Sequence, residues 1–169
     1  CAATGQFGMA IASSSPAVAA RCAHVRAGVG AVASQNITDP ALGPLLLDQL
    51  ESGLPAAQAL QAVTEGADFI DYRQLLVVDR TGRTAIHSGA QVLGLWGEAR
   101  ADNCAAGGNL LASELVPLAM VEALSGATGH LAERLMQALE AGLAAGGEAG
   151  PVHSAGLKVA DRLSWPVVD

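Results

Sequence analysis

Short runs of small and β-branched residues alternate with turn-forming residues along this chain, which is the pattern of a protein rich in strands. The runs predict strands at 7–14, 28–35, 72–78, 83–87, 102–107 and 154–161. Asp79-Arg80-Thr81-Gly82 separates the third run from the fourth, so these two strands are expected to form an antiparallel hairpin. Residues 164–169 lead toward a further strand.

Four other segments repeat leucine and alanine at helical spacing. Asp39 and Pro40 are an N-cap and a first-turn proline, and they begin a predicted helix that ends at Ser52-Gly53. Further helices are expected over 55–66, after Asn109 with Leu111, Leu115, Leu118 and Ala119 on one side, and over 128–145. Runs of strands separated by helix pairs favour an α+β fold in which two sheets lie between two helix layers.

The length and composition fit one compact domain. The chain has 169 residues, of which 51% are hydrophobic and only 3% aromatic. A chain of this length buries a substantial core without dividing into two domains. Because glycine and alanine are abundant, that core is expected to bring backbones close together, with Leu, Val and Ala between them.

Net charge and cysteine content restrict the classes of binding partner and cofactor that the chain is expected to have. A net charge of -7 argues against binding to a nucleic-acid backbone, which needs clustered Lys and Arg. No run reaches the roughly 20 apolar residues of a membrane helix, so no membrane partner is expected. Cys1, Cys22 and Cys104 are odd in number and widely spaced, which favours reduced thiols and a cytoplasmic protein. Cys22 and His24 are the only close Cys/His pair, so we expect no metal and no other cofactor.

Cys1 is the first candidate for chemistry. It combines a thiol with an α-amine whose ordinary pKa is about 8, so a free amine there can take the thiol proton directly or through one water. Two other interpretations remain open: a cysteine at the edge of a fragment, and a lipid-modified cysteine. A lipid anchor usually precedes a flexible polar linker, whereas a strand is expected here from Phe7.

Three polar residues stand where predicted strands or helices begin or end. Ser13 ends the first strand, and His153 follows a Gly-Pro turn where its imidazole can act as a general base or a substrate donor. Asn109 follows two glycines before a helix, where N–H groups can face an anionic substrate. Each also has a structural interpretation, as a turn former, a loop histidine and an N-cap.

Five stretches in one order, covering nearly the whole chain, resemble the bacterial and archaeal Ntn-hydrolase-like family catalogued as domain-of-unknown-function family 1028. They are TGQFGMAIASSSPAVAA, RAGVGAVASQNITDP, YRQLLVVDRTGR, CAAGGNLL and LAERLMQALEAGLAAGG. The resemblance implies the four-layer αββα sandwich of Ntn hydrolases. Members of this family carry a short strand before the position of Cys1 and continue past Asp169, so the single domain over 1–169 is expected to be incomplete at both ends.

The resemblance also implies roles for residues in and beside the second predicted strand. Arg26 stands where proteasome-type Ntn enzymes place a lysine that assists the nucleophile; an arginine cannot act as a base, but it can stabilise an oxyanion. Gln35 and Asn36 lie in the stretch that offers donors to a tetrahedral intermediate. Ntn relatives commonly assemble through their sheet edges and helix layers, so a homo-oligomer is expected.

These inferences combine into the hypothesis of an amidohydrolase that cleaves a C–N amide bond of a small-molecule substrate. Cys1 attacks, its amine carries the proton, and Arg26 and Asn36 stabilise the developing charge. The expected substrate-binding residues are Ser13, Gln35, Asn109 and His153. The alternative is a non-catalytic binding or assembly protein that keeps the Ntn fold, which is favoured by arginine in place of lysine and by the lack of an acidic residue after Ala12.

Overall fold

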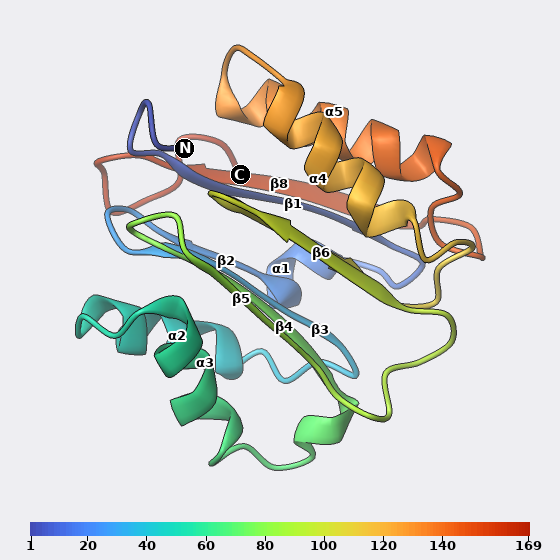
Figure 1. Ribbon diagram of the computed structural model, residues 1–169, viewed down its shortest axis with the longest axis horizontal. Coiled ribbons are helices and arrows are strands. Elements are labelled where there is room, and N and C mark those ends of the chain that lie inside the picture. The colour runs from blue at the N-terminus through green and yellow to red at the C-terminus, as the bar shows by residue number, and fades with distance from the viewer.

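The computed structural model describes residues 1–169, and its helices and strands lie in layers (Figure 1). Helices α4 (Val116–Gly126) and α5 (Leu131–Ala144) form one outer layer. Helices α2 (Leu42–Glu51) and α3 (Ala56–Thr64) form the opposite one, and the strands lie between them. The result is a mixed fold of helices and antiparallel sheets, which agrees with the predicted α+β class.

The strands form three antiparallel sheets. The largest has the order β2-β3-β4-β5, and the two others are the pairs β1-β8 and β6-β7. The strand bounds are β1 (Phe7–Ser13), β2 (Ala23–Arg26), β3 (Gly30–Asn36), β4 (Arg73–Asp79), β5 (Thr84–Ser88), β6 (Gly97–Ala101), β7 (Cys104–Gly108) and β8 (Ser154–Ala160). In the first pair the two ends of the chain meet, because Phe7 lies opposite Ala160 and Ser13 lies opposite Ser154. Both small sheets lie on the side of α4 and α5 (Figure 1).

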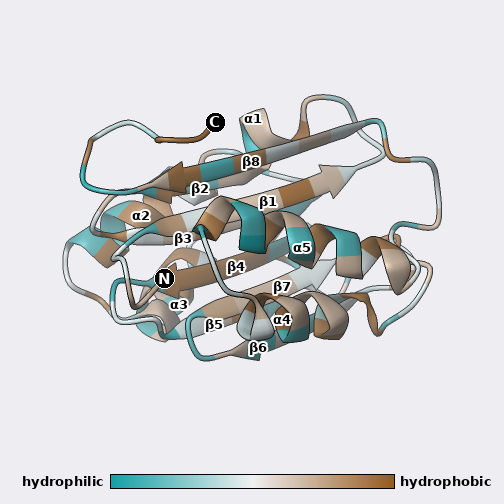
Figure 2. Ribbon diagram, turned by 90° about the horizontal axis from the view of Figure 1, so that it is seen from above, coloured by the Kyte–Doolittle hydropathy of each residue, from teal (hydrophilic) through white to brown (hydrophobic).

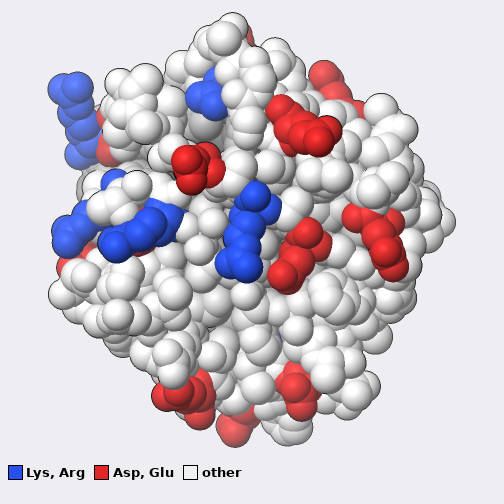
Figure 3. Space-filling model, in the orientation of Figure 1, with Lys and Arg blue, Asp and Glu red and all other residues white.

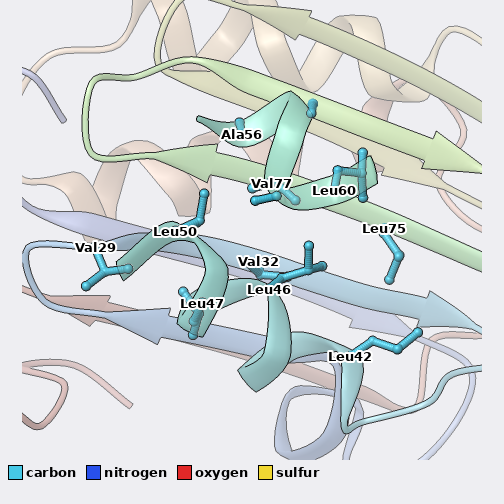
Figure 4. Packing of buried hydrophobic residues seen from close by; sticks show 12 residues of the cluster. Val29, Val32, Leu42, Leu46, Leu47, Leu50, Ala56, Leu60, Leu75 and Val77 are labelled. Carbon is cyan, nitrogen blue, oxygen red and sulfur yellow. The ribbon is translucent and has the colours of Figure 1, made fainter. Parts of the chain in front are cut away.

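The main hydrophobic core lies between the large sheet and the helix pair α2 and α3 (Figure 4). Leu46 of α2, Val32 of β3 and Leu75 of β4 are fully buried there. The alternation of β4 and the i, i+4 spacing of Leu42, Leu46 and Leu50 direct these side chains toward one another. One face of the large sheet is therefore packed against α2 and α3.

The predicted hairpin is present, and a buried carboxylate holds its turn. Asp79, at the end of β4, accepts hydrogen bonds from the N–H and hydroxyl of Thr81 at 2.8 and 2.7 Å. It also accepts them from the N–H and the Nε of Arg83, and from the N–H of Ala56 at the start of α3. Asp79 thus joins the β4–β5 turn to the first turn of the neighbouring helix.

Three short elements do not follow from the sequence pattern. Helix α1 (Val18–Cys22) and strand β2 lie between the first two predicted strands, and β6 precedes the strand predicted at 102–107. Each has only four or five residues. A period of 2 or 3.6 residues is not visible over so few positions, so only the packing of the whole domain determines them.

The start of the third predicted helix is wrong. Helix α4 begins at Val116, with Pro117 in its first turn, and not after Asn109. Its buried side is formed by Val116, Pro117 and Val121, whereas Leu115 is 63% exposed. Leu110, Leu111 and Leu115 are spaced as in a helix, but they lie in the loop that precedes α4.

Acidic and basic side chains both lie on the surface. On the face shown in Figure 3, acidic and basic side chains are interspersed and no extended basic patch appears. None of the helices combines the length and the apolar character needed to cross a membrane.

Candidate active site

A cavity of about 650 Å³ lies between the two small sheets. Seen from above, α4 and α5 lie over this part of the molecule (Figure 2), and they contribute Leu124, Leu131 and Leu135 to its wall. Ala33 of β3 and Leu76 of β4 line its opposite side. A largely apolar cavity with polar groups at its ends is the usual form of a ligand site.

One end of the cavity is polar, where β1 ends at Ser13. The Ser13 hydroxyl lies 3.1 Å from the Ser15 hydroxyl and accepts a hydrogen bond from the Ser15 N–H. Beside them, the carboxylate of Glu148 accepts hydrogen bonds from the N–H and the hydroxyl of Ser14. The predicted substrate contact Ser13 therefore lines the cavity next to a carboxylate.

Two predicted amide side chains meet at the same end. Gln35 Nε2 donates to Gln74 Oε1 at 2.8 Å and to the carbonyl of Gly107 at 3.0 Å. Asn109 Nδ2 lies 3.5 Å from the same Gln74 oxygen. Gln74 is fully buried, so this network joins β3, β4 and the end of β7. The side-chain N–H groups of Gln35 are thus already engaged in hydrogen bonds. Its side-chain oxygen, Oε1, accepts no hydrogen bond from the protein.

Cys1 lies at the opposite end of the cavity, next to Arg134 of α5. The Cys1 sulfur is 3.5 Å from Nη1 of Arg134, and Nη2 donates to the carbonyl of Leu124 at 3.0 Å. Arg134 forms no ion pair with a carboxylate, and its buried Nε has no hydrogen-bond partner. A positive charge without a counter-ion beside a thiol stabilises a thiolate or an oxyanion.

The α-amine of Cys1 closes a tight turn with the start of β1. It donates to the carbonyl of Gln6 at 2.5 Å, and the Cys1 carbonyl accepts the N–H groups of Thr4 and Gly5. Gly5 has a φ of 75°, which favours glycine. Burial, with a further contribution from the charge of Arg134, lowers the pKa of this amine below 8.0, since both disfavour the ammonium form. In a chain that starts at Cys1, this amine is therefore neutral over a wider range of pH than an exposed one.

Arg26 lies in another part of the molecule. It is on β2 of the large sheet and pairs with Asp48 and Glu51 of α2 at 2.8 and 2.6 Å. Neither Arg26 nor its two partners line the cavity. The structure does not bring Arg26 to Cys1, and the residue beside the thiol is Arg134.

Replacing Arg26 with glutamine is expected to change the free energy of unfolding by less than about 1 kcal/mol. Both carboxylates are more than half exposed, so water and salt screen these pairs strongly. Urea denaturation of the variant and the parent protein measures the difference. A loss much greater than 1 kcal/mol, at low and high salt alike, contradicts this prediction.

Asn36 and His153 are held by backbone groups. Asn36 has a φ of 72°, and its side chain bonds the carbonyl of Tyr72 and the N–H of Leu93, so it anchors a loop at the edge of the cavity. His153 is exposed, and its Nδ1 lies 2.8 Å from the carbonyl of Ser14. Both residues lie toward the polar end, away from Cys1.

Sequence reasoning missed Arg134, Glu148 and Gln74. On the helical pattern Arg134 belongs to the polar face of α5, which normally meets solvent. One signal was available, because Arg134 is the only Lys or Arg between Arg100 and Lys158. A single basic residue beside the apolar face of a helix is a signal that its side chain has a specific contact within the fold. Glu148 and Gln74 carry no comparable signal, since only the fold places them at the cavity.

Comparison with known proteins places the chain in a family. No curated protein matches it. A solved structure that does match is the crystal structure of protein SPO2555 from Silicibacter pomeroyi, described as belonging to the DUF1028 family, with 29% sequence identity and a TM-score of 0.91. The match covers 99% of this chain and 73% of that one. The profile of the family described as "Family of unknown function (DUF1028)" matches residues 1–169. The chain therefore belongs to the DUF1028 family.

Proposed function

We propose that the chain hydrolyses a C–N amide bond, with Cys1 as an N-terminal nucleophile at the end of the cavity. The observation that carries the proposal is the contact of the Cys1 sulfur with Arg134 at 3.5 Å, beside an α-amine of lowered pKa. Nucleophile and proton acceptor thereby lie on one residue of the cavity wall, and the positive charge lies behind that residue, in contact with its sulfur. The order of the layers in Figure 1 supports the Ntn-hydrolase sandwich that the sequence resemblance implies.

The proposed reaction has two steps. The neutral amine takes the thiol proton, the sulfur attacks the amide carbon, and the Arg134 guanidinium stabilises the oxyanion of the tetrahedral intermediate. The amine then returns the proton to the leaving nitrogen, so an amine departs and a thioester remains on Cys1. Water, activated by the same α-amine, hydrolyses the thioester and releases a carboxylic acid.

The other predicted site residues differ in whether they line the cavity. Ser13, Gln35 and Asn109 line the polar end of the cavity, where they are proposed to contact a small-molecule substrate. His153 stands outside the cavity lining, and Asn36 is proposed to support the site through the loop that it anchors. The oxyanion role proposed for Arg26 passes to Arg134. A homo-oligomer remains a proposal.

Trapping an acyl-enzyme tests this function. A chain whose amino-terminal sequence starts at Cys1 and whose mass is 16.9 kDa is incubated with a series of straight-chain acyl p-nitroanilides. Intact mass is expected to show one acyl group, located on Cys1 and removed by hydroxylamine, as for a thioester. The Cys1→Ala variant should lose the adduct. The matched variant Cys104→Ala, which removes a buried thiol from another part of the same cavity wall, should still be acylated on Cys1.

Two results contradict the proposal. One is acylation that survives Cys1→Ala, because the nucleophile then lies elsewhere. The other is the absence of any adduct over the whole series in a chain with a free Cys1 amine. The second result supports the alternative of a non-catalytic binding protein, which is favoured by the location of Arg26 in a structural ion-pair cluster.

A further inference from the structure

A second pocket, of about 490 Å³, lies away from the candidate active site. It is formed by the start of α3, the β4–β5 turn and the β6–β7 turn, and it shares no lining residue with the larger cavity. The two turns are in direct contact, because the N–H of Asn103 donates to the carbonyl of Gly82 at 3.0 Å. A side chain at Gly82 would overlap the amide oxygen of Asn103. Close packing of the two turns therefore sets the shape of the pocket.

Three charged side chains line this pocket: Arg83, Arg100 and Asp102. Arg83 is fixed in place, because its Nε donates to the buried carboxylate of Asp79 at 3.0 Å and its backbone N–H donates to the same carboxylate. The Nη1 and Nη2 groups of Arg83 make no hydrogen bond to the protein, and its side chain is 62% exposed. Asp79 thus balances the charge of Arg83 and leaves two of its nitrogen atoms as donors for a ligand.

Arg100 and Asp102 line the pocket without pairing. They stand two residues apart at the end of β6, so their side chains point to one side of the chain, with roughly 7 Å between their Cα atoms. Neither side chain forms an ion pair with any group of the protein. The pocket therefore offers a ligand one positive and one negative group, together with the free donors of Arg83.

This set of charges selects the chemistry of the ligand. The pocket as a whole is neutral, because the two guanidinium groups are matched by the carboxylates of Asp79 and Asp102. A simple anion is attracted by the guanidinium groups but repelled by Asp102, and a simple cation meets the reverse. A small zwitterion meets an opposite charge at both of its ends. No lining residue is aromatic, so the pocket favours a primary ammonium group over a quaternary one, which needs aromatic faces.

We propose that this pocket binds a free α-amino acid. The carboxylate of the amino acid accepts hydrogen bonds from Arg83 and Arg100, and its ammonium group donates to Asp102. The volume leaves room for the side chain of the ligand, and the uncharged lining residues are small, so the head group is what the pocket recognises. The expected dissociation constant is about 1 mM, since the charged side chains are exposed. This site is separate from the proposed hydrolysis and does not depend on it.

The test follows the backbone amide signals of the isotope-labelled parent chain by NMR while L-leucine is added. Shifts are expected at residues 82–84 and 100–102, with a dissociation constant of about 1 mM at low ionic strength. Two matched ligands lack one charge each: isocaproate has no amino group, and isoamylamine has no carboxylate. Each is expected to bind at least about five-fold more weakly than L-leucine.

Two variants remove one charge each from the pocket. Arg100→Gln and Asp102→Asn are each expected to weaken the binding of L-leucine by at least about five-fold. Both variants should fold, because neither side chain takes part in an ion pair. The matched control is Arg26→Gln, which removes an arginine outside the pocket and should keep the parent affinity.

Four results overturn the inference. Equal affinities for L-leucine and isocaproate mean that the pocket takes any carboxylate. A lack of shifts up to about 20 mM L-leucine, or shifts centred on the larger cavity, means that no such site exists here. Parent affinity in both pocket variants excludes Arg100 and Asp102 as ligand contacts. A loss in Arg26→Gln equal to that in Arg100→Gln means that net charge, and not this pocket, governs binding.

Discussion

Replacing Asp79 with asparagine is expected to lower the free energy of unfolding by about 3 kcal/mol. Asp79 is 2% exposed and accepts five hydrogen bonds from three residues. Asparagine has nearly the same shape, but it turns one of the two acceptor oxygens into a donor. At least one buried donor, the Ala56 N–H or the Arg83 guanidinium, then loses its partner or meets another donor.

The pH dependence of stability gives a second measurement of the same effect. Burial alone raises the pKa of Asp79, but hydrogen bonds from Thr81, Ala56 and Arg83 outweigh it and lower the pKa from 3.8 to about 2. A carboxyl whose pKa is lower in the folded state stabilises the protein above its unfolded pKa. This contribution, about 2 kcal/mol, is lost as the pH falls from about 4 to about 2.

Urea denaturation of the parent protein and of Asp79→Asn between pH 7 and pH 2 measures both effects. The difference between the two proteins should narrow as the pH falls through 4 and toward 2. Asp102→Asn is the matched control, because Asp102 is exposed in the β6–β7 turn and should change stability little. A difference between parent and Asp79→Asn that stays constant down to pH 2 means that the ionised carboxylate is not the stabilising species.

The α+β class was predictable because its strongest elements carry local signals. The β4–β5 hairpin has a turn sequence between two apolar runs, and α5 has leucine at every fourth position. Both elements show their period within their own residues. The pairing of β1 with β8 has no such signal, since it joins residues about as far apart in the sequence as the chain allows. No local pattern encodes a contact of that range.

The candidate site was predictable only in part, for the same reason. Ser13 ends β1, Gln35 is the last residue but one of β3, and Asn109 follows β7. All three lie at strand ends, so their meeting at one end of the cavity has a simple cause. Arg26 was assigned by resemblance to a position in another family, and its two carboxylate neighbours on α2 are invisible in that comparison. Tertiary packing alone brings Arg134 of α5 to Cys1.

Replacing Arg134 with glutamine is expected to slow acylation of Cys1 by about 100-fold, which is about 3 kcal/mol of transition-state stabilisation. Glutamine can still donate to the carbonyl of Leu124, but it brings no positive charge to the thiolate or the oxyanion. The rate of acyl-enzyme formation, followed by intact mass, measures the effect. Glu133→Gln, an exposed neighbour on the same helix, is the matched control and should keep the parent rate.

The pH profile of acylation separates this electrostatic role from a packing role. Burial is the first cause of the lowered pKa of the Cys1 amine, and the charge of Arg134 is the second. In the proposed mechanism the amine must be neutral to accept the thiol proton, so the rate is expected to rise with pH, with a midpoint below 8.0 in the parent protein. Removing the charge lets the pKa rise toward its ordinary value, so Arg134→Gln moves the midpoint to higher pH. Arg134→Lys keeps the charge and should keep the lower midpoint, even where altered geometry reduces the rate.

If glutamine and lysine give the same midpoint as arginine, Arg134 only packs against Cys1, and the proposed stabilisation of charge is wrong.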